Sequence, residues 1–164
     1  MTRVVVMGVS GCGKSSIGAA VAARLGARFI DGDHLHPDAN IAKMARGEAL
    51  NDADRTPWLA RVGAALIADN TVVACSALKR IYRDQIRAAA GAEVVFLHLK
   101  GDREVLLDRV SNRPGHFMPA SLLDSQLAIL EDPQPDETHL TADIRSTPDQ
   151  IVANAVIALK GMQP

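Results

Sequence analysis

The sequence is poor in cysteine and aromatic residues, carries almost no net charge, and has no long apolar run. Its two cysteines, Cys12 and Cys75, are too few for a disulfide framework and lack metal-ligand spacing, so we expect two free thiols. With 18 Lys and Arg against 19 Asp and Glu, the net charge of −1 gives no reason to expect a nucleic-acid or anionic-membrane partner. No apolar run approaches the roughly 18 residues of a membrane span, and the N-terminal run lacks a signal-peptide layout. A cytoplasmic protein is expected.

What the sequence does contain fits one globular domain, expected to span residues 1–164. Hydrophobic residues make up 48% of its 164 residues and charged residues 23%, which allows a sizeable core. No internal repeat, low-complexity tract or linker interrupts the chain. Because only 3% of the residues are aromatic, the sequence disfavours an aromatic-walled pocket of the kind that would bind a nucleobase.

A glycine-rich stretch near the N-terminus has the form G-x-x-x-x-G-K-[ST]. It reads Gly8-Val9-Ser10-Gly11-Cys12-Gly13-Lys14-Ser15, and it lies between a β-branched run at 3–7 and an Ala-rich helical pattern at 16–25. Glycines let such a loop bend around an anion, so that backbone N–H groups and the helix N-terminus point at one phosphate group. The stretch from Gly8 to Ser16 is therefore the predicted ATP phosphate site. Lys14 is its candidate catalytic cation, and Ser15 is a candidate ligand of Mg²⁺.

A second polar cluster, Asp31-Gly32-Asp33-His34-Leu35-His36-Pro37, follows an apolar run at 27–30. Alternate residues of an extended segment point the same way, so the carboxylates of Asp31 and Asp33 are predicted to face one cleft. Asp33 is the candidate residue that orients and deprotonates an acceptor hydroxyl, and Asp31 is the candidate for contacts to Mg²⁺ through water. A plain Asp-Gly turn is the alternative interpretation. A metal site at His34 and His36 would need a third ligand.

Cationic side chains supply a further candidate site. Lys79 and Arg83 are four residues apart on a predicted helix that follows the strand 71–76, so they can share one face and bind the same anion. A solvated helix face is the alternative. Pro57 is predicted to open a helix at 57–67, after a polar connector at 51–55. Trp58 at its start fits either a core position or the wall of a ligand site.

Apolar runs and helical patterns alternate along the chain. Strands are expected at 3–7, 27–30, 71–76, 93–99 and 139–144, and helices at 16–25, 40–46, 57–67, 79–84, 102–113, 120–130 and 147–160. This alternation predicts an α/β fold with a parallel sheet of about five strands and helices on both faces. Ligands of such sheets bind at the carboxyl ends of the strands, so the segments described above should meet in one cleft.

The helices at 102–113 and 120–130 are separated by a break at Pro114-Gly115-His116-Phe117. This helix, break, helix unit, approximately residues 103–131, is a candidate lid over the phosphates. Arg109 and Arg113 are its candidate catalytic residues. They would close over the transferred phosphoryl group, where charge builds up in the transition state.

Several blocks spread over most of the chain carry a family resemblance. They are the glycine-rich stretch 8–15, the cluster 31–37, Asn40-Ile41-Ala42-Lys43-Met44, Leu50-Asn51-Asp52-Ala53-Asp54-Arg55, Pro57-Trp58-Leu59, Cys75-Ser76-Ala77-Leu78-Lys79, Tyr82-Arg83-Asp84, Leu99-Lys100-Gly101-Asp102 and Gly115-His116-Phe117. Together they resemble the gluconokinases, which are small P-loop kinases. The P-loop alone is shared by many NTPases, whereas the blocks 31–37 and 75–84 are much more specific.

The resemblance implies a three-layer P-loop kinase fold of the nucleoside-monophosphate-kinase-like type with a helical lid, and usually a homodimer. It implies ATP-dependent phosphorylation of D-gluconate at its 6-hydroxyl, with Mg²⁺, to give 6-phosphogluconate for the pentose phosphate or Entner–Doudoroff route. The family commonly has Ser where this chain has Cys12. The thiol is then either a neutral spacer or a point of sensitivity to oxidation.

The chemistry of gluconate fits the polar residues of the chain. Gluconate has a carboxylate and a row of hydroxyl groups, so its pocket needs cations together with hydrogen-bonding carboxylates and imidazoles. The predicted substrate-binding residues are Asp31, Asp33, His36, Arg55, Lys79 and Arg83. A shikimate-kinase-like or nucleoside-monophosphate kinase is the nearest alternative. A GTP-binding switch protein is disfavoured, because neither D-x-x-G nor N-K-x-D occurs in the sequence.

Overall fold

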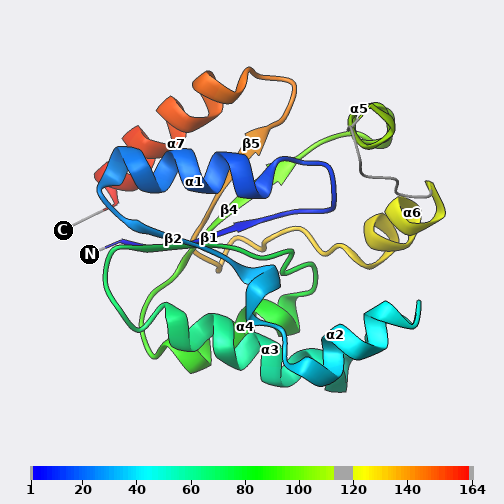
Figure 1. Ribbon diagram of the computed structural model, residues 1–164. Helices are drawn as coiled ribbons and strands as arrows, with labels where there is room; N and C mark the ends of the chain where they lie inside the picture. The colour runs from blue at the N-terminus through cyan, green and yellow to red at the C-terminus, as the bar shows by residue number, and fades with distance from the viewer. Residues whose placement is uncertain (1, 113–119, 163–164) are drawn as a thin grey trace.

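A central parallel sheet organises the chain. A computed structural model describes residues 2–112 and 120–162, and within them five strands form one parallel sheet in the order β2-β3-β1-β4-β5 (Figure 1). The strands are β1 (Arg3–Met7), β2 (Arg28–Asp31), β3 (Thr71–Ala74), β4 (Val95–Lys100) and β5 (His139–Asp143). In the middle of the sheet, Val5 of β1 pairs with Val73 of β3 and with Phe96 of β4. The β-branched residues of β1 suit a strand that is covered on both faces.

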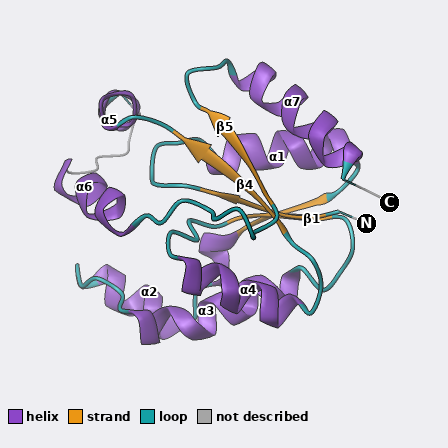
Figure 2. Ribbon diagram, turned by 180° about the vertical axis from the view of Figure 1, so that it is seen from behind, coloured by secondary structure: helices purple, strands orange, loops and turns teal. Residues whose placement is uncertain are grey.

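Helices cover both faces of the sheet, as Figure 2 shows. The helices α1 (Lys14–Leu25) and α7 (Pro148–Gly161) lie on one face, and α3 (Asp52–Ala65) and α4 (Arg80–Ala90) lie on the other. Because successive strand residues point to opposite faces, Val4 and Val6 pack in the core under α1 and α7, whereas Val5 and Met7 pack in the core under α3 and α4. The predicted three-layer α/β fold is confirmed.

The remaining elements lie beyond the carboxyl ends of the strands, on the side away from both termini (Figure 1). They are the 3₁₀ helix η1 (Gly32–Leu35), α2 (Asp38–Ala45), α5 (Arg103–Ser111) and α6 (Ala120–Ile129). The helices α5 and α6 correspond to the expected lid, whose closure stays a prediction. The predicted break at Pro114-Gly115-His116-Phe117 lies outside the described residues. Among the described helices, none is both long and apolar enough to span a bilayer.

The sequence pattern predicts that the helix α3 begins at Pro57, but it begins at Asp52. The Asn51 side chain accepts a hydrogen bond from the N–H of Asp54 (2.7 Å), and the Asp54 carboxylate accepts one from the N–H of Asn51 (2.9 Å). This capping box pairs two N–H groups that a helix start otherwise leaves free. The expected polar connector is therefore the first turn of the helix, which gives Asp52 and Arg55 fixed positions.

Candidate active site

Two adjoining cavities open at the carboxyl end of the sheet. The smaller, of about 190 Å³, is lined by Ser10, Lys14, Ser15, Asp31, Asp33, His36, Leu50, Arg55, Trp58, Ala74, Cys75, Ser76 and Gln126. The larger, of about 970 Å³, is lined chiefly by residues of 44–55, 76–82 and α6. Leu50, Arg55, Ser76 and Gln126 line both cavities. The predicted meeting of the P-loop, the cluster 31–37 and the 76–79 segment in one cleft is thus what the fold produces.

The P-loop bends through backbone conformations that favour glycine. Gly11 and Gly13 have φ angles of 85° and 94°, and a Cβ on Gly11 would lie 2.5 Å from a methyl carbon of Val110 on α5. The Lys14 ammonium folds back over the loop and donates to the carbonyl of Val9 (3.1 Å). An ammonium group and the N-terminus of α1 therefore face the smaller cavity together, which makes it suited to an anion.

Cys12 lies under this loop and not on its open side. Its side chain is 1% exposed, and burial raises the pKa of its thiol. Burial also raises the pKa of Cys75 to about 12. Both cysteines are free, as expected, and the reactive thiolate form is disfavoured at each.

Asp31 and Asp33 both line the smaller cavity, but not because the segment is extended. Asp31 ends β2 and caps η1: its Oδ1 accepts from the N–H of Asp33 (3.0 Å), while its Oδ2 accepts from the hydroxyl of Ser15 (3.2 Å). The predicted extended geometry is therefore wrong, and a 3₁₀ turn places Asp33. Gly32 permits this turn, because a Cβ there would lie 2.3 Å from the carbonyl oxygen of Ala74.

The same atoms fit an Mg²⁺ site of the kind that kinases use. Ser15 and Asp31 present a hydroxyl and a carboxylate oxygen 3.2 Å apart beside Lys14, and Mg²⁺ prefers oxygen ligands of this kind. Within residues 2–112 and 120–162, no group of three His, Cys, Asp or Glu side chains could hold a metal ion by itself. Magnesium in such sites takes most of its remaining ligands from the nucleotide and water.

Trp58 and His36 form one wall of the smaller cavity. Their rings stack with centroids 4.1 Å apart, and the Trp58 indole N–H donates to the carbonyl of Gly32 (2.8 Å). Trp58 is only 4% exposed and also packs in the core under α3, so it serves as core and as wall. Burial is the main cause that lowers the pKa of His36, which favours a neutral imidazole near pH 7.

Arg55, Lys79, Tyr82 and Asp52 form a cluster on the wall of the larger cavity, here named the Asp52 cluster. The Tyr82 hydroxyl donates to Asp52 Oδ1 (2.5 Å), and the Lys79 ammonium lies 3.4 Å from both carboxylate oxygens. Arg55 Nη1 donates to the carbonyl of Leu50 (2.7 Å) and lies 4.0 Å from Asp52 Oδ1. Two cations thus share one carboxylate, so the cluster has a positive charge available for an incoming anion.

The pKa shifts of Asp52 and Lys79 both favour the charged form of the side chain. The hydrogen bond from Tyr82 is the largest of several contacts that lower the pKa of Asp52. Tyr82 and Asp52 together raise the pKa of Lys79. The cluster therefore keeps its ion pair at neutral pH.

Arg83 does not share the cavity wall with Lys79. Helix α4 begins at Arg80, so Lys79 is its N-cap residue, and the fully buried Arg83 side chain points into the protein, where it pairs with Glu137 at 2.7 Å. The prediction that Lys79 and Arg83 converge on one anion is wrong for this geometry. Helical spacing predicted a common face for both residues, but it could not show that Arg83 packs against Glu137 while Lys79 faces the larger cavity.

The candidate lid arginines lie differently from the cavity residues. Arg109 is on α5 and donates through Nη2 to the carbonyl of Ile144, and it does not line either cavity as the described residues form them. Arg113 lies outside the described residues. Both roles stay predictions.

Gln126 of α6 is a site residue that the sequence did not reveal. Its side-chain oxygen accepts from the N–H of Ser10 (2.7 Å), and its amide nitrogen donates to the Ser10 hydroxyl (3.0 Å). It therefore joins the candidate lid to the P-loop. No motif surrounds Gln126. Asp52 and Tyr82 were also not assigned to the site from the sequence, although both lie within the blocks that carry the family resemblance. The spacing of Tyr82, one helical turn after Lys79, was a further signal.

Comparison with known proteins agrees with this geometry. A family model for shikimate kinase matches residues 10–159. A gluconokinase from Gluconobacter oxydans is 45% identical over 158 residues, covering 93% of this chain and 88% of that protein, and a thermosensitive gluconokinase from Escherichia coli is 45% identical with 95% and 88% covered. The crystal structure of a gluconokinase from Sinorhizobium meliloti superposes with a TM-score of 0.90 at 47% identity, covering 98% of this chain and 93% of that one. The chain belongs to the gluconokinase family, within the shikimate-kinase-like group of P-loop kinases.

Proposed function

We propose that the protein transfers the γ-phosphoryl group of ATP to the 6-hydroxyl of D-gluconate, giving 6-phosphogluconate and ADP. The observation that carries the proposal is the pair of adjoining cavities. One holds Lys14, Ser15, Asp31 and Asp33, and the other holds the cations of the Asp52 cluster. A phosphate donor and an anionic polyol can then meet at the boundary. The family to which the chain belongs supports gluconate as the acceptor over shikimate or a nucleoside monophosphate.

The donor side of the reaction rests on the P-loop. The phosphates lie against the N–H groups of residues from Gly8 to Ser16, and the Lys14 ammonium offsets the charge of the β- and γ-phosphates. Ser15 would hold an Mg²⁺ ion bound with ATP and Asp31 would hold its waters, and the ion would neutralise phosphate charge. Of these residues, Ser10, Lys14, Ser15 and Asp31 line the smaller cavity.

The acceptor side assigns Asp33 to the reacting hydroxyl. A carboxylate within about 3 Å can orient the 6-hydroxyl and accept its proton as the bond to phosphorus forms. His36 lines the same cavity and binds neighbouring hydroxyl groups of the substrate. The far end of the substrate, its carboxylate, binds Lys79 and Arg55 in the larger cavity. Arg83 takes no part as a direct ligand.

The lid supplies the remaining charges. Arg109 and Arg113 close over the transferred group, and they act mainly on kcat because charge accumulates there in the transition state. The enzyme acts in the cytoplasm as a homodimer, and its product enters the pentose phosphate or Entner–Doudoroff route. These last assignments are what the resemblance to the gluconokinases implies.

One assay tests the proposal. ADP release is measured with ATP and Mg²⁺ against gluconate, gluconolactone, shikimate and the common nucleoside monophosphates, and the product is identified by its coupling to 6-phosphogluconate dehydrogenase. We expect rapid turnover with gluconate as the acceptor and none with the other compounds. Faster turnover with shikimate or a nucleotide, or a product that the dehydrogenase does not oxidise, would refute it.

A further inference from the structure

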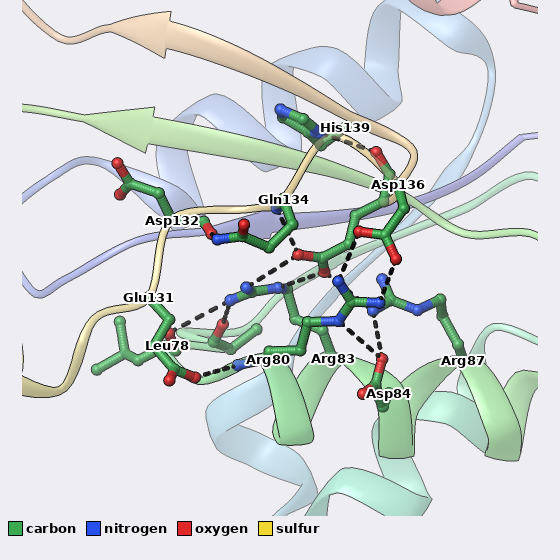
Figure 3. A network of polar contacts seen from close by, with 12 residues as sticks. Leu78, Arg80, Arg83, Asp84, Arg87, Glu131, Asp132, Gln134, Asp136 and His139 are labelled. Atoms are coloured by element: carbon green, nitrogen blue, oxygen red, sulfur yellow. Dashed lines mark hydrogen bonds and ion pairs between the residues drawn. The ribbon is translucent and has the colours of Figure 1, made fainter.

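Arg83 is a charged side chain in the protein core that the reaction does not use directly. Its side chain and that of Glu137 are both 0% exposed. Nε and Nη2 donate to the two carboxylate oxygens of Glu137 at 2.7 and 3.2 Å, which is the forked geometry that only arginine can form. Figure 3 shows Arg83 within this network of polar contacts, beside Arg80, Arg87 and Gln134. Burying this pair costs desolvation free energy, a cost that an apolar pair of similar volume would not carry.

Glu137 is fixed from several sides. Its carboxylate also accepts from the N–H of Gln134 (2.7 Å) and from Arg87 Nη2 (2.9 Å). Burial by itself would raise the pKa of Glu137, but these donors and Arg83 outweigh it and lower the pKa to about 2. The carboxylate is therefore a charged and immobile anchor for the Arg83 guanidinium at any pH near neutral.

The free edge of the guanidinium holds a strained turn. Arg83 Nη1 donates to the carbonyl of Ala77 (2.9 Å) and to that of Leu78 (3.3 Å). Ala77 has a φ of 46°, in the left-handed region that residues with a Cβ rarely occupy. Such a conformation persists only where its surroundings impose it, and the two bonds from Arg83 do so here.

This turn carries the acceptor-side wall of the site. Ser76 lines both cavities, and Leu78 and Lys79 line the larger one. The Leu78 carbonyl also accepts from the N–H of Glu131 (2.8 Å), just after the candidate lid helix α6. The position of the turn therefore decides where the Lys79 ammonium lies relative to Asp52.

We propose that Arg83, anchored by Glu137, is a positioning residue that holds the Ala77–Lys79 turn and so sets Lys79 for the substrate carboxylate. The inference rests on the proposed function, because it takes gluconate as the anion that Lys79 binds. An apolar pair could fill the same volume, but it could not supply two N–H donors to the turn.

Two variants separate positioning from plain stability. Arg83→Lys keeps a charge for Glu137 but cannot reach both the carboxylate and the two carbonyls. The double variant Arg83→Met with Glu137→Met removes both buried charges, a change that often leaves stability nearly unaltered. Arg80→Met is the matched control, because it removes an arginine of the same helix whose partner, Asp136, is exposed.

Steady-state kinetics with wild type as reference give the first readout. In both Arg83 variants we expect the KM for gluconate to rise about tenfold with the KM for ATP unchanged, and the control to match wild type. Lys79→Ala should then cost less in an Arg83→Lys background than in wild type, because the two residues act in series. Effects on kcat/KM that simply multiply would overturn the inference.

Hydrogen exchange supplies a readout that needs no substrate. We expect the amides of Glu131 and Gly8, which donate to the carbonyls of Leu78 and Ser76, to exchange faster in Arg83→Lys, while those of β3 stay protected. Unchanged exchange at these two amides would overturn the inference even if kinetics changed. If wild type itself does not phosphorylate gluconate, the proposed function fails, and this exchange experiment still decides whether Arg83 holds the turn.

Discussion

Replacing Lys79 with alanine should selectively weaken the binding of the substrate carboxylate. In the free enzyme the Lys79 ammonium lies 3.4 Å from both oxygens of Asp52, and it is the partner that an incoming carboxylate would share. Its removal has two effects: the substrate loses a charge-assisted contact, and Asp52 loses a counter-charge beside the binding site. The second effect adds like-charge repulsion to the first.

The size of the loss follows from these two effects. A single charge-assisted contact corresponds to about a ten- to hundredfold change in kcat/KM. The added repulsion between Asp52 and the substrate carboxylate moves the result toward the upper end of that range. Adding Asp52→Asn to Lys79→Ala removes the repulsion and should recover part of the loss, leaving about a tenfold defect. The KM for ATP should stay unchanged in both, because Lys79 does not line the smaller cavity.

The assay is ADP release at varied gluconate with saturating ATP, and then at varied ATP with saturating gluconate. Lys160→Ala is the matched control: it removes the same charge from an exposed position on α7, away from both cavities. Unchanged gluconate kinetics in Lys79→Ala would refute the assignment. So would an equal rise in both KM values, which would indicate general damage to the site.

Three further predictions follow from particular contacts. Asp33→Asn should lower kcat by about 10²- to 10⁴-fold with little change in the KM for gluconate, whereas Asp31→Asn should shift the Mg²⁺ dependence; the opposite pattern in ADP-release kinetics would reverse the two roles. Gln126→Leu should raise the KM for ATP or lower kcat, together about tenfold in kcat/KM, because Ser10 loses two hydrogen bonds to α6; unaltered ATP kinetics would contradict it. Burial lowers the pKa of His98 from 6.5 to about 4, so the unfolded chain binds its proton first. The free energy of unfolding should therefore be highest above pH 6.5 and fall by at most about 3 kcal/mol toward pH 4. Denaturant titrations of His98→Leu at several pH values should show a smaller fall in the free energy of unfolding between pH 6.5 and pH 4. A fall equal to that of wild type would exclude His98 as its source.

Local signals were enough to predict the sheet and the conformation of the P-loop. The β-branched run 3–7, the glycine spacing of the P-loop and the helix stop at Gly26 all act over a few residues, and each is confirmed by the structure. The start of α3 was missed because its capping box uses Asp54 at the position where Glu or Gln is the usual signal. Pro57 then offered a stronger but misleading start.

Contacts between distant segments were beyond the reach of such signals. Arg83 and Glu137 are 54 residues apart, and Ser10 and Gln126 are 116 apart. Helical spacing can place Arg83 on a face, but only the packing of α4 against residues 131–137 decides that this face is buried. The charge of Arg83 therefore suggested a ligand where the fold uses it as a support.

The two sides of the cleft are built by different means. The strands β1 and β3 are neighbours, and the turns after them meet where the N–H of Gly8 donates to the carbonyl of Ser76 (3.2 Å). The turn after β1 offers backbone atoms to a phosphate group, an arrangement that many acceptor specificities can share. The turn after β3 presents side chains, and Arg83 is proposed to hold its shape. Acceptor choice should then change through the Asp52 cluster and its supports while the P-loop stays as it is, which places gluconate specificity on the β3 side of the cleft.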